Sequence, residues 1–143
     1  MREIKFRAWH KKYKWFGQVV WLDIPHNNTE NPKLGVVTKD IPPDGWDADE
    51  FELKEAILMQ YTGLKDENGV EIYEGDIVKL TLETDLQDDT CKVMFGRGYF
   101  GVTADDFEYE PLFLHAGTCK VVGNIYANPE LLDPTPQKGK DNE

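Results

Sequence analysis

The stretch that decides the fold is Ile57-Leu-Met-Gln-Tyr-Thr-Gly-Leu-Lys-Asp-Glu-Asn-Gly-Val-Glu-Ile-Tyr-Glu-Gly-Asp-Ile-Val78. It begins with a run of strand formers at 57–63 and reaches Asn68-Gly69, a strong hairpin-turn signal because both residues tolerate a positive φ. Residues 70–73 lead out of that turn. Glu74-Gly75-Asp76 turns the chain again, with the Asp76 carboxylate placed to accept from nearby backbone N–H groups. Residues 77–82 form a further strand, so the stretch predicts antiparallel pairing through tight turns.

The N-terminal residues 2–22 predict a β-hairpin. Ile4, Phe6 and Ala8 alternate with basic residues, which is the period of two that a half-buried strand requires. A polar turn follows at 11–14, and residues 15–22 supply the second strand.

The remaining sequence predicts short strands, turns and two helical turns. We expect a strand within 35–38, a helical turn within 47–51, an exposed acidic stretch at 105–110 and a helical turn at 128–132. A tight hairpin at Gly96-Arg97-Gly98 is expected to join strands at 91–95 and 99–102, with further strands at 112–114 and 119–126. Residues 1–132 are predicted to be one domain, with 23–52 as a variable insertion and 133–143 as a disordered tail.

Three segments carry a family resemblance. They are Arg2-Glu-Ile-Lys-Phe-Arg-Ala-Trp9, the stretch from Leu58 to Val78, and Val122-Gly-Asn-Ile-Tyr-Ala-Asn-Pro-Glu-Leu-Leu132. In order and spacing they resemble the YopX family of phage and prophage proteins. The resemblance implies a mostly β fold, a small SH3-like β-barrel or roll with the N-terminal hairpin and short helical turns. It implies no assigned activity and transfers no catalytic, cofactor or metal-binding residue.

The composition is that of a globular protein, with 40% hydrophobic and 12% aromatic residues in 143. No apolar run approaches the roughly 20 residues that cross a bilayer, and the N-terminus lacks the apolar core of a secretion signal. We therefore expect a cytoplasmic protein that does not bind membranes, and the resemblance implies that the cytoplasm is that of a bacterial host cell. Cys91 and Cys119 are expected to be small, partly buried thiols, with a disulfide or redox role as the alternative.

No pattern in the sequence predicts an enzyme. His10, His26 and His115 lack metal-site spacing. The acidic pairs Asp49-Glu50, Asp88-Asp89 and Asp105-Asp106 are ordinary in a chain with 27 acidic residues, and Gly96-Arg97-Gly98 lacks the lysine and helix of a phosphate loop. We expect no catalytic residue, no cofactor and no metal.

The net charge of −11 is unevenly distributed. Residues 1–20 hold six basic side chains and one acidic one, interleaved with aromatic rings. We call this set the N-terminal strip; it comprises Arg2, Lys5, Phe6, Arg7, Trp9, Lys11, Lys12, Tyr13, Lys14, Trp15 and Phe16. Cations and rings together are typical of single-stranded nucleic-acid binders, yet the same alternation also describes the solvated face of an ordinary strand.

Two functions from different classes remain open. The first is a non-enzymatic interaction module that binds a protein partner or a second copy of itself, with the basic hairpin against an acidic surface. The second is a nucleic-acid-related role, through weak single-strand binding by the strip or through acidic mimicry of DNA. The acidic net charge disfavours direct nucleic-acid binding, because such affinity depends on neutralising phosphates.

Overall fold

The computed structural model describes residues 3–27, 30–37, 48–81, 88–104 and 107–132. The chain forms two compact units, residues 1–61 and 62–143, which we describe separately. The predicted tail at 133–143 lies outside the described residues. The prediction of one domain over 1–132, with 23–52 as an insertion, stays a prediction.

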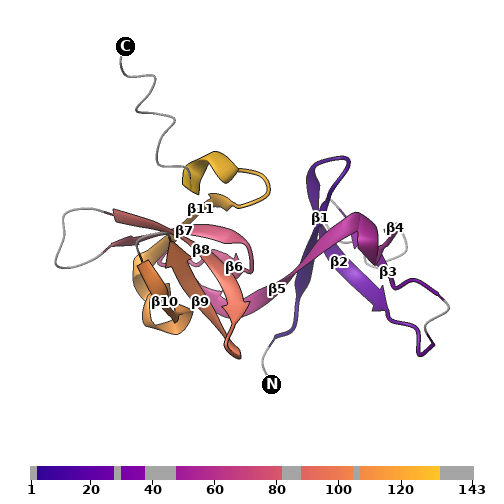
Figure 1. The fold of residues 1–143 in the computed structure, drawn as a ribbon, viewed down its shortest axis with the longest axis horizontal. Helices are drawn as coiled ribbons and strands as arrows, with labels where there is room; N and C mark the ends of the chain where they lie inside the picture. Colours follow the sequence, from indigo (N-terminus) through magenta and orange to yellow (C-terminus); the bar gives the residue numbers. More distant parts are fainter. Residues whose placement is uncertain (1–2, 28–29, 38–47, 82–87, 105–106, 133–143) are drawn as a thin grey trace, which may run out of the picture. The chain divides into compact units, whose positions relative to one another are not determined.

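The first unit is an antiparallel sheet (Figure 1). Its strands are β1 (Phe6–His10), β2 (Trp15–Asp23), β3 (Lys33–Val37), β4 (Asp49–Glu52) and β5 (Ala56–Lys65), with a single 3₁₀ turn, η1 (Leu53–Glu55), before β5. They are ordered β4-β3-β2-β1-β5 within a six-stranded sheet that continues to β6, so β1 lies between β2 and β5, and β4 lies at one edge. The expected N-terminal hairpin is confirmed, and Ala8 opposes Gly17 on β2 and Leu58 on β5.

One hydrophobic cluster of the first unit is built around four buried residues, Ala8, Leu34, Val36 and Ala56. Partly buried residues pack around them: Trp15, Val19, Leu22, Phe51, Leu53 and Leu58. Within 23–52, β3 pairs with β2 and supplies two of these buried residues, so the described part of that segment belongs to the core. Trp9, Val37, Met59 and Tyr61 are also buried, outside this cluster.

The second unit contains a five-stranded antiparallel sheet ordered β10-β9-β8-β7-β11. Its strands are β7 (Asp76–Thr81), β8 (Asp88–Gly96), β9 (Tyr99–Ala104), β10 (Phe107–Pro111) and β11 (Cys119–Asn124). The short β6 (Glu71–Tyr73) pairs with β5, and 3₁₀ turns form η2 (Leu112–Leu114), η3 (Ala116–Thr118) and η4 (Pro129–Leu132). The β8–β9 hairpin at Gly96-Arg97-Gly98 and the helical turn near the end are confirmed.

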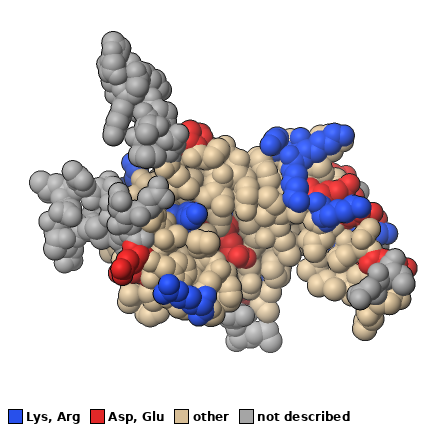
Figure 2. Space-filling model, in the orientation of Figure 1, with Lys and Arg blue, Asp and Glu red and all other residues tan. Residues whose placement is uncertain are grey.

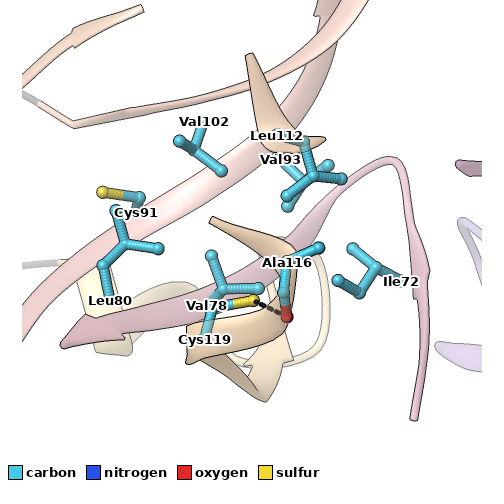
Figure 3. Close-up of a cluster of buried hydrophobic side chains, with 9 residues drawn as sticks. All are labelled: Ile72, Val78, Leu80, Cys91, Val93, Val102, Leu112, Ala116 and Cys119. Carbon is cyan, nitrogen blue, oxygen red and sulfur yellow. Dashed lines mark hydrogen bonds between the residues drawn. The ribbon is translucent and has the colours of Figure 1, made fainter. Parts of the chain in front are cut away.

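Nine buried side chains form the core of this unit (Figure 3). They are Ile72, Val78, Leu80, Cys91, Val93, Val102, Leu112, Ala116 and Cys119. Val78 on β7 lies opposite both Cys91 on β8 and Val121 on β11. Because alternate residues of a strand face the same side of the sheet, the side chains of these three strands share one apolar layer.

A buried carboxylate ties the β5–β6 turn to β11. One oxygen of Asp66 accepts from the backbone N–H groups of Asn68 at 2.8 Å and Val70 at 2.9 Å. The other accepts from Val121 N–H at 2.9 Å, across 55 residues of chain. Burial by itself would raise the pKa of Asp66, but the three N–H donors outweigh it, so this pKa is lowered. We call this arrangement the Asp66 clasp.

A second buried carboxylate closes the β6–β7 turn. Asp76 accepts from Tyr73 N–H at 2.8 Å, as expected from the sequence, and from the Asn124 side chain at 3.4 Å. Gly75 has a φ of 84°, which a residue with a Cβ rarely adopts. Its carbonyl accepts from Ile125 N–H at 2.8 Å. The central and C-terminal segments of the family resemblance are therefore joined by hydrogen bonds.

Two local predictions were wrong. Residues 112–114 form a 3₁₀ turn instead of a strand, because the chain turns after Pro111 and buries Leu112 while Phe113 and Leu114 stay exposed. Residues 49–52 form β4, and the helical turn follows at 53–55. Within the acidic stretch at 105–110, which was expected to be exposed, β10 pairs with β9; Glu108 is exposed, and Tyr109 and Glu110 are half-buried.

The fold is mostly β, with two antiparallel sheets. Among the described residues no closed barrel is found, so the SH3-like barrel is not confirmed.

Candidate functional site

The structure divides the N-terminal strip into a packed part and an exposed part. Trp9 is buried, and Phe6, Trp15 and Phe16 are half-buried, whereas Tyr13 is 60% exposed. Arg2 lies outside the described residues. The strip therefore does not present a row of exposed rings.

Outside the β1–β2 turn, two of its cations lie against ring faces within the first unit, and on the turn the Lys12 ammonium lies 5.3 Å from the centre of the Tyr13 ring. The Lys5 ammonium lies 5.1 Å from the centre of the Tyr61 ring, and the Arg7 guanidinium lies 4.9 Å from that of Phe16. Both side chains are half-buried. These contacts are of the cation–π type and stabilise the sheet.

The remaining cations sit on the β1–β2 turn, which His10 holds in one shape. The buried His10 ring accepts from the backbone N–H groups of Lys12 and Tyr13, at 3.2 and 3.1 Å from Nδ1. It also stacks on the rings of Tyr13 and Trp15, with centroids 4.6 and 5.5 Å away. The two hydrogen bonds that its Nδ1 accepts and the stacking of its ring fix the path of the turn.

The turn is also fastened to the segment before β5. Lys11 N–H donates to the Glu55 carbonyl at 3.1 Å, and the Lys11 ammonium donates to the Lys54 carbonyl at 2.9 Å. Lys54 in turn pairs with Glu52 at 3.0 Å, and the hydrogen bond to that carboxylate raises the pKa of Lys54.

Lys11, Lys12 and Lys14 are exposed on this fastened turn, and we call them the basic tip. Lys14 has a φ of 60°, an uncommon conformation for a residue with a side chain. Figure 2 shows Lys and Arg side chains gathered over the β1–β2 hairpin, with acidic side chains next to them. In the part of the chain that the structure describes, no carboxylate pairs with Lys12 or Lys14. The tip is therefore a preorganised cationic surface that fits an anionic partner.

The other polar candidates are dispersed. His26 is exposed. His115 contacts Glu110 at 2.8 Å, and Asp49 and Glu50 are exposed on β4. Asp88-Asp89 begins β8, with side chains that are not described, and Asp105-Asp106 lies outside the described residues. Among the residues described, no group of three or more His, Cys, Asp or Glu side chains could hold a metal ion.

Both cysteines are free and buried in the core of the second unit. Cys91 lies opposite Val78 and Cys119 opposite Leu80, so β7 runs between them. Two strand spacings are about 9.6 Å, which exceeds the about 7 Å that a disulfide allows between Cα atoms. Burial raises the pKa of Cys119 to about 11, which keeps this thiol protonated.

Sequence reasoning missed His10 and Lys54. The spacing of His10 bears only on metal binding, and nothing in it shows that the ring accepts hydrogen bonds from the following turn. Lys54 reaches the basic tip only through the pairing of β1 with β5, which a linear pattern does not specify.

A family model and a curated relative indicate the same family. Residues 5–133 match the family described as YopX protein. A curated relative, the SPbeta prophage-derived uncharacterized protein YopX of Bacillus subtilis strain 168, is 34% identical over 67 residues. That match covers 43% of this chain and about half of the relative's length, 50%. No helix among the described residues is long and apolar enough to cross a membrane.

Two solved structures are similar over most of the chain. Protein EF1440 from Enterococcus faecalis is 26% identical, with a TM-score of 0.64, and the match covers 93% of this chain and 100% of that one. The protein yopX from Bacillus subtilis is 23% identical, with a TM-score of 0.58 and coverage of 90% and 98%. The second likeness concerns the fold alone.

Proposed function

This chain belongs to the YopX family, and from that premise we propose that it is a phage- or prophage-encoded, non-enzymatic protein that acts by binding another protein, including a second copy of itself. The basic tip is the contact surface in this proposal. Its partner is an acidic surface of a neighbouring copy.

The observation that carries the proposal is the fixed geometry of the basic tip. A mobile lysine loop would lose conformational entropy on binding, whereas a turn already held by His10 and Glu55 loses little. The buried carboxylates of the second unit support a non-enzymatic role, because Asp66 and Asp76 are engaged by backbone N–H groups that hold the fold together.

Size-exclusion chromatography with light scattering tests the proposal. The experiment starts at about 0.1 M salt, where a Debye length of about 10 Å already screens the net repulsion between acidic copies. We expect an oligomer there that dissociates towards about 1 M salt, where the screening length falls to about 3 Å. A monomer under every condition would refute self-association.

A second function is favoured by one observation, the exposed Tyr13 ring among three lysines. Single-stranded nucleic acid could stack one base there while the lysines contact phosphates. A mobility-shift assay at low salt with single- and double-stranded probes tests this role, and no shift at micromolar protein would exclude it. Acidic mimicry of DNA predicts capture of a basic DNA-binding host protein, and recovery of none would count against it.

The cellular location and the finer fold belong to the same proposal. Free, buried thiols suit a reducing compartment, which supports the cytoplasm of a bacterial host cell. The last strand of the second unit, β11, returns to pair with β7, the first strand of its five-stranded sheet. That return supports an SH3-like roll in this unit, since small rolls and barrels bring such strands together.

A further inference from the structure

The first unit carries an acidic surface close to the basic tip. Asp49, Glu50 and Glu55 are exposed on β4 and η1, and Glu52 is half-buried between them. We call these four residues the acidic edge. The first unit has nine basic and ten acidic side chains, so its charges nearly balance. Within the acidic edge, Glu50 pairs with Lys33 at 3.8 Å and Glu52 with Lys54 at 3.0 Å, and the four carboxylates with these two lysines keep a net negative charge.

Several contacts fix the distance between the two surfaces. Lys11 of the basic tip bonds to the carbonyls of Lys54 and Glu55, directly beside the acidic edge. The His10 ring lies edge-on to Phe51 of β4, with centroids 4.6 Å apart. The two surfaces therefore move as one piece.

We infer that the partner of the basic tip is the acidic edge of a second copy, in a closed two-fold dimer of the first units. This inference rests on the proposed function and specifies its contact. In a two-fold dimer each surface patch meets the other patch of its partner, so adjacent patches of opposite charge can both be used at once. Each dimer then contains two identical tip-to-edge contacts.

The position of β4 supports a cationic partner rather than a second acidic strand. β4 ends the sheet order, and such edges extend readily by pairing with another strand. Pairing β4 with β4 of a second copy would bring acidic residues together, which is unfavourable. A lysine-bearing turn meets the same edge with complementary charge.

The experiment uses two charge reversals in the full-length chain. The tip variant is Lys12→Glu/Lys14→Glu, and the edge variant is Asp49→Lys/Glu50→Lys. These exposed positions avoid the Glu52 and Glu55 side chains, which form a capping box at η1. Glu50→Lys also removes the exposed ion pair with Lys33, whose loss costs below about 1 kcal/mol of stability. In a dimer of the tip variant, an acidic tip would meet an acidic edge. In a dimer of the edge variant, a basic tip would meet a basic edge. Mixing the two variants restores opposite charges at both contacts of a mixed dimer.

Sedimentation equilibrium measures each dimer, and native mass spectrometry identifies mixed dimers. We expect each variant alone to raise the dimer dissociation constant at least about tenfold, and the mixture to form the mixed dimer with nearly wild-type affinity. The matched control is Glu108→Lys/Glu130→Lys, which makes the same charge change at exposed positions of the second unit and should leave the dimer intact. Tryptophan fluorescence confirms folding, and Lys12→Gln/Lys14→Gln replaces a tip variant that fails to fold.

The outcomes separate this inference from the proposed function. A wild-type protein that is monomeric at every salt concentration would refute both. A wild-type oligomer that the tip variant disrupts, while the edge variant behaves as wild type, would refute only the inference. Disruption by the second-unit control would also refute it, because it would place the acidic contact on the second unit.

Discussion

The Asp66 clasp allows a stability prediction to be worked out from distances. In Asp66→Asn, the amide oxygen can still accept from Asn68 and Val70, but the amide NH₂ then faces the Val121 N–H, donor against donor. One hydrogen bond to a charged acceptor is lost, at about 1.5–3 kcal/mol, and the other two become weaker. We expect the free energy of unfolding of the second unit to fall by about 2–4 kcal/mol.

The assay can follow the two units separately. All four tryptophans lie within residues 1–61 and both cysteines within 62–143. In urea, tryptophan fluorescence therefore reports on the first unit and cysteine labelling on the second. With a slope of about 1 kcal/mol per molar urea, the labelling midpoint should fall by about 2 M or more. The control Glu67→Gln loses one partly exposed ion pair with Lys120, worth below about 1 kcal/mol.

The pH dependence gives an independent check. Because the pKa of folded Asp66 is lowered from 3.8, its stabilisation is complete above pH 3.8 and is lost as the pH falls through the folded-state pKa. Wild type should therefore approach Asp66→Asn in stability under acid conditions. If Asp66→Asn and Glu67→Gln shifted the midpoint equally, or if the gap to wild type stayed constant into acid, the role assigned to the clasp would be wrong.

Three further predictions concern the second unit. In the native state at pH 8, Cys91 and Cys119 should react with a thiol reagent only at the rate of unfolding and should form no internal disulfide; a rapid phase would contradict their burial. Gly101→Ala should destabilise the second unit by about 1–3 kcal/mol, since the added Cβ would clash with the Tyr109 ring. Gly117→Ala, where a Cβ would meet nothing within 4 Å, should be nearly neutral in the same urea titration. Tyr109→Phe should cost about 1–2 kcal/mol, because its hydroxyl lies 2.6–3.2 Å from three backbone carbonyls; an unchanged midpoint would refute this.

Local chemistry made much of the fold predictable. The alternation around Ala8 and the turn residues Asn68-Gly69 and Gly96-Arg97-Gly98 each specify structure within a few residues, and those hairpins are present. The strand predicted at 112–114 was wrong because three consecutive apolar residues fit a strand or a turn equally well. Of the three, only Leu112 enters the core.

The division into two units was not predictable from periodicity. β5 runs without interruption from Ala56 to Lys65, and its first half pairs with β1. No linker residues mark the boundary at Tyr61, so a linear reading shows one strand.

Only part of the candidate site followed from the sequence. The basic residues at 11–14 were evident, but alternation could not show which rings of the strip are packed away. The role of His10 depends on Phe51, 41 positions later, and on Trp15 across the turn. Such contacts come from tertiary pairing.

The Asp66 clasp also has a consequence for the order in which the chain is made. Asp66 leaves the ribosome 55 residues before Val121, a delay of about 3–11 s at 5–20 residues per second. During that interval the β5–β6 turn can form, because Asn68 and Val70 follow at once. The second unit, however, still lacks β11, the strand that carries Cys119 into the core. In the nascent chain, one oxygen of Asp66 therefore has its N–H donor, Val121, only after β11 is translated. Translation of that strand completes the sheet of the second unit.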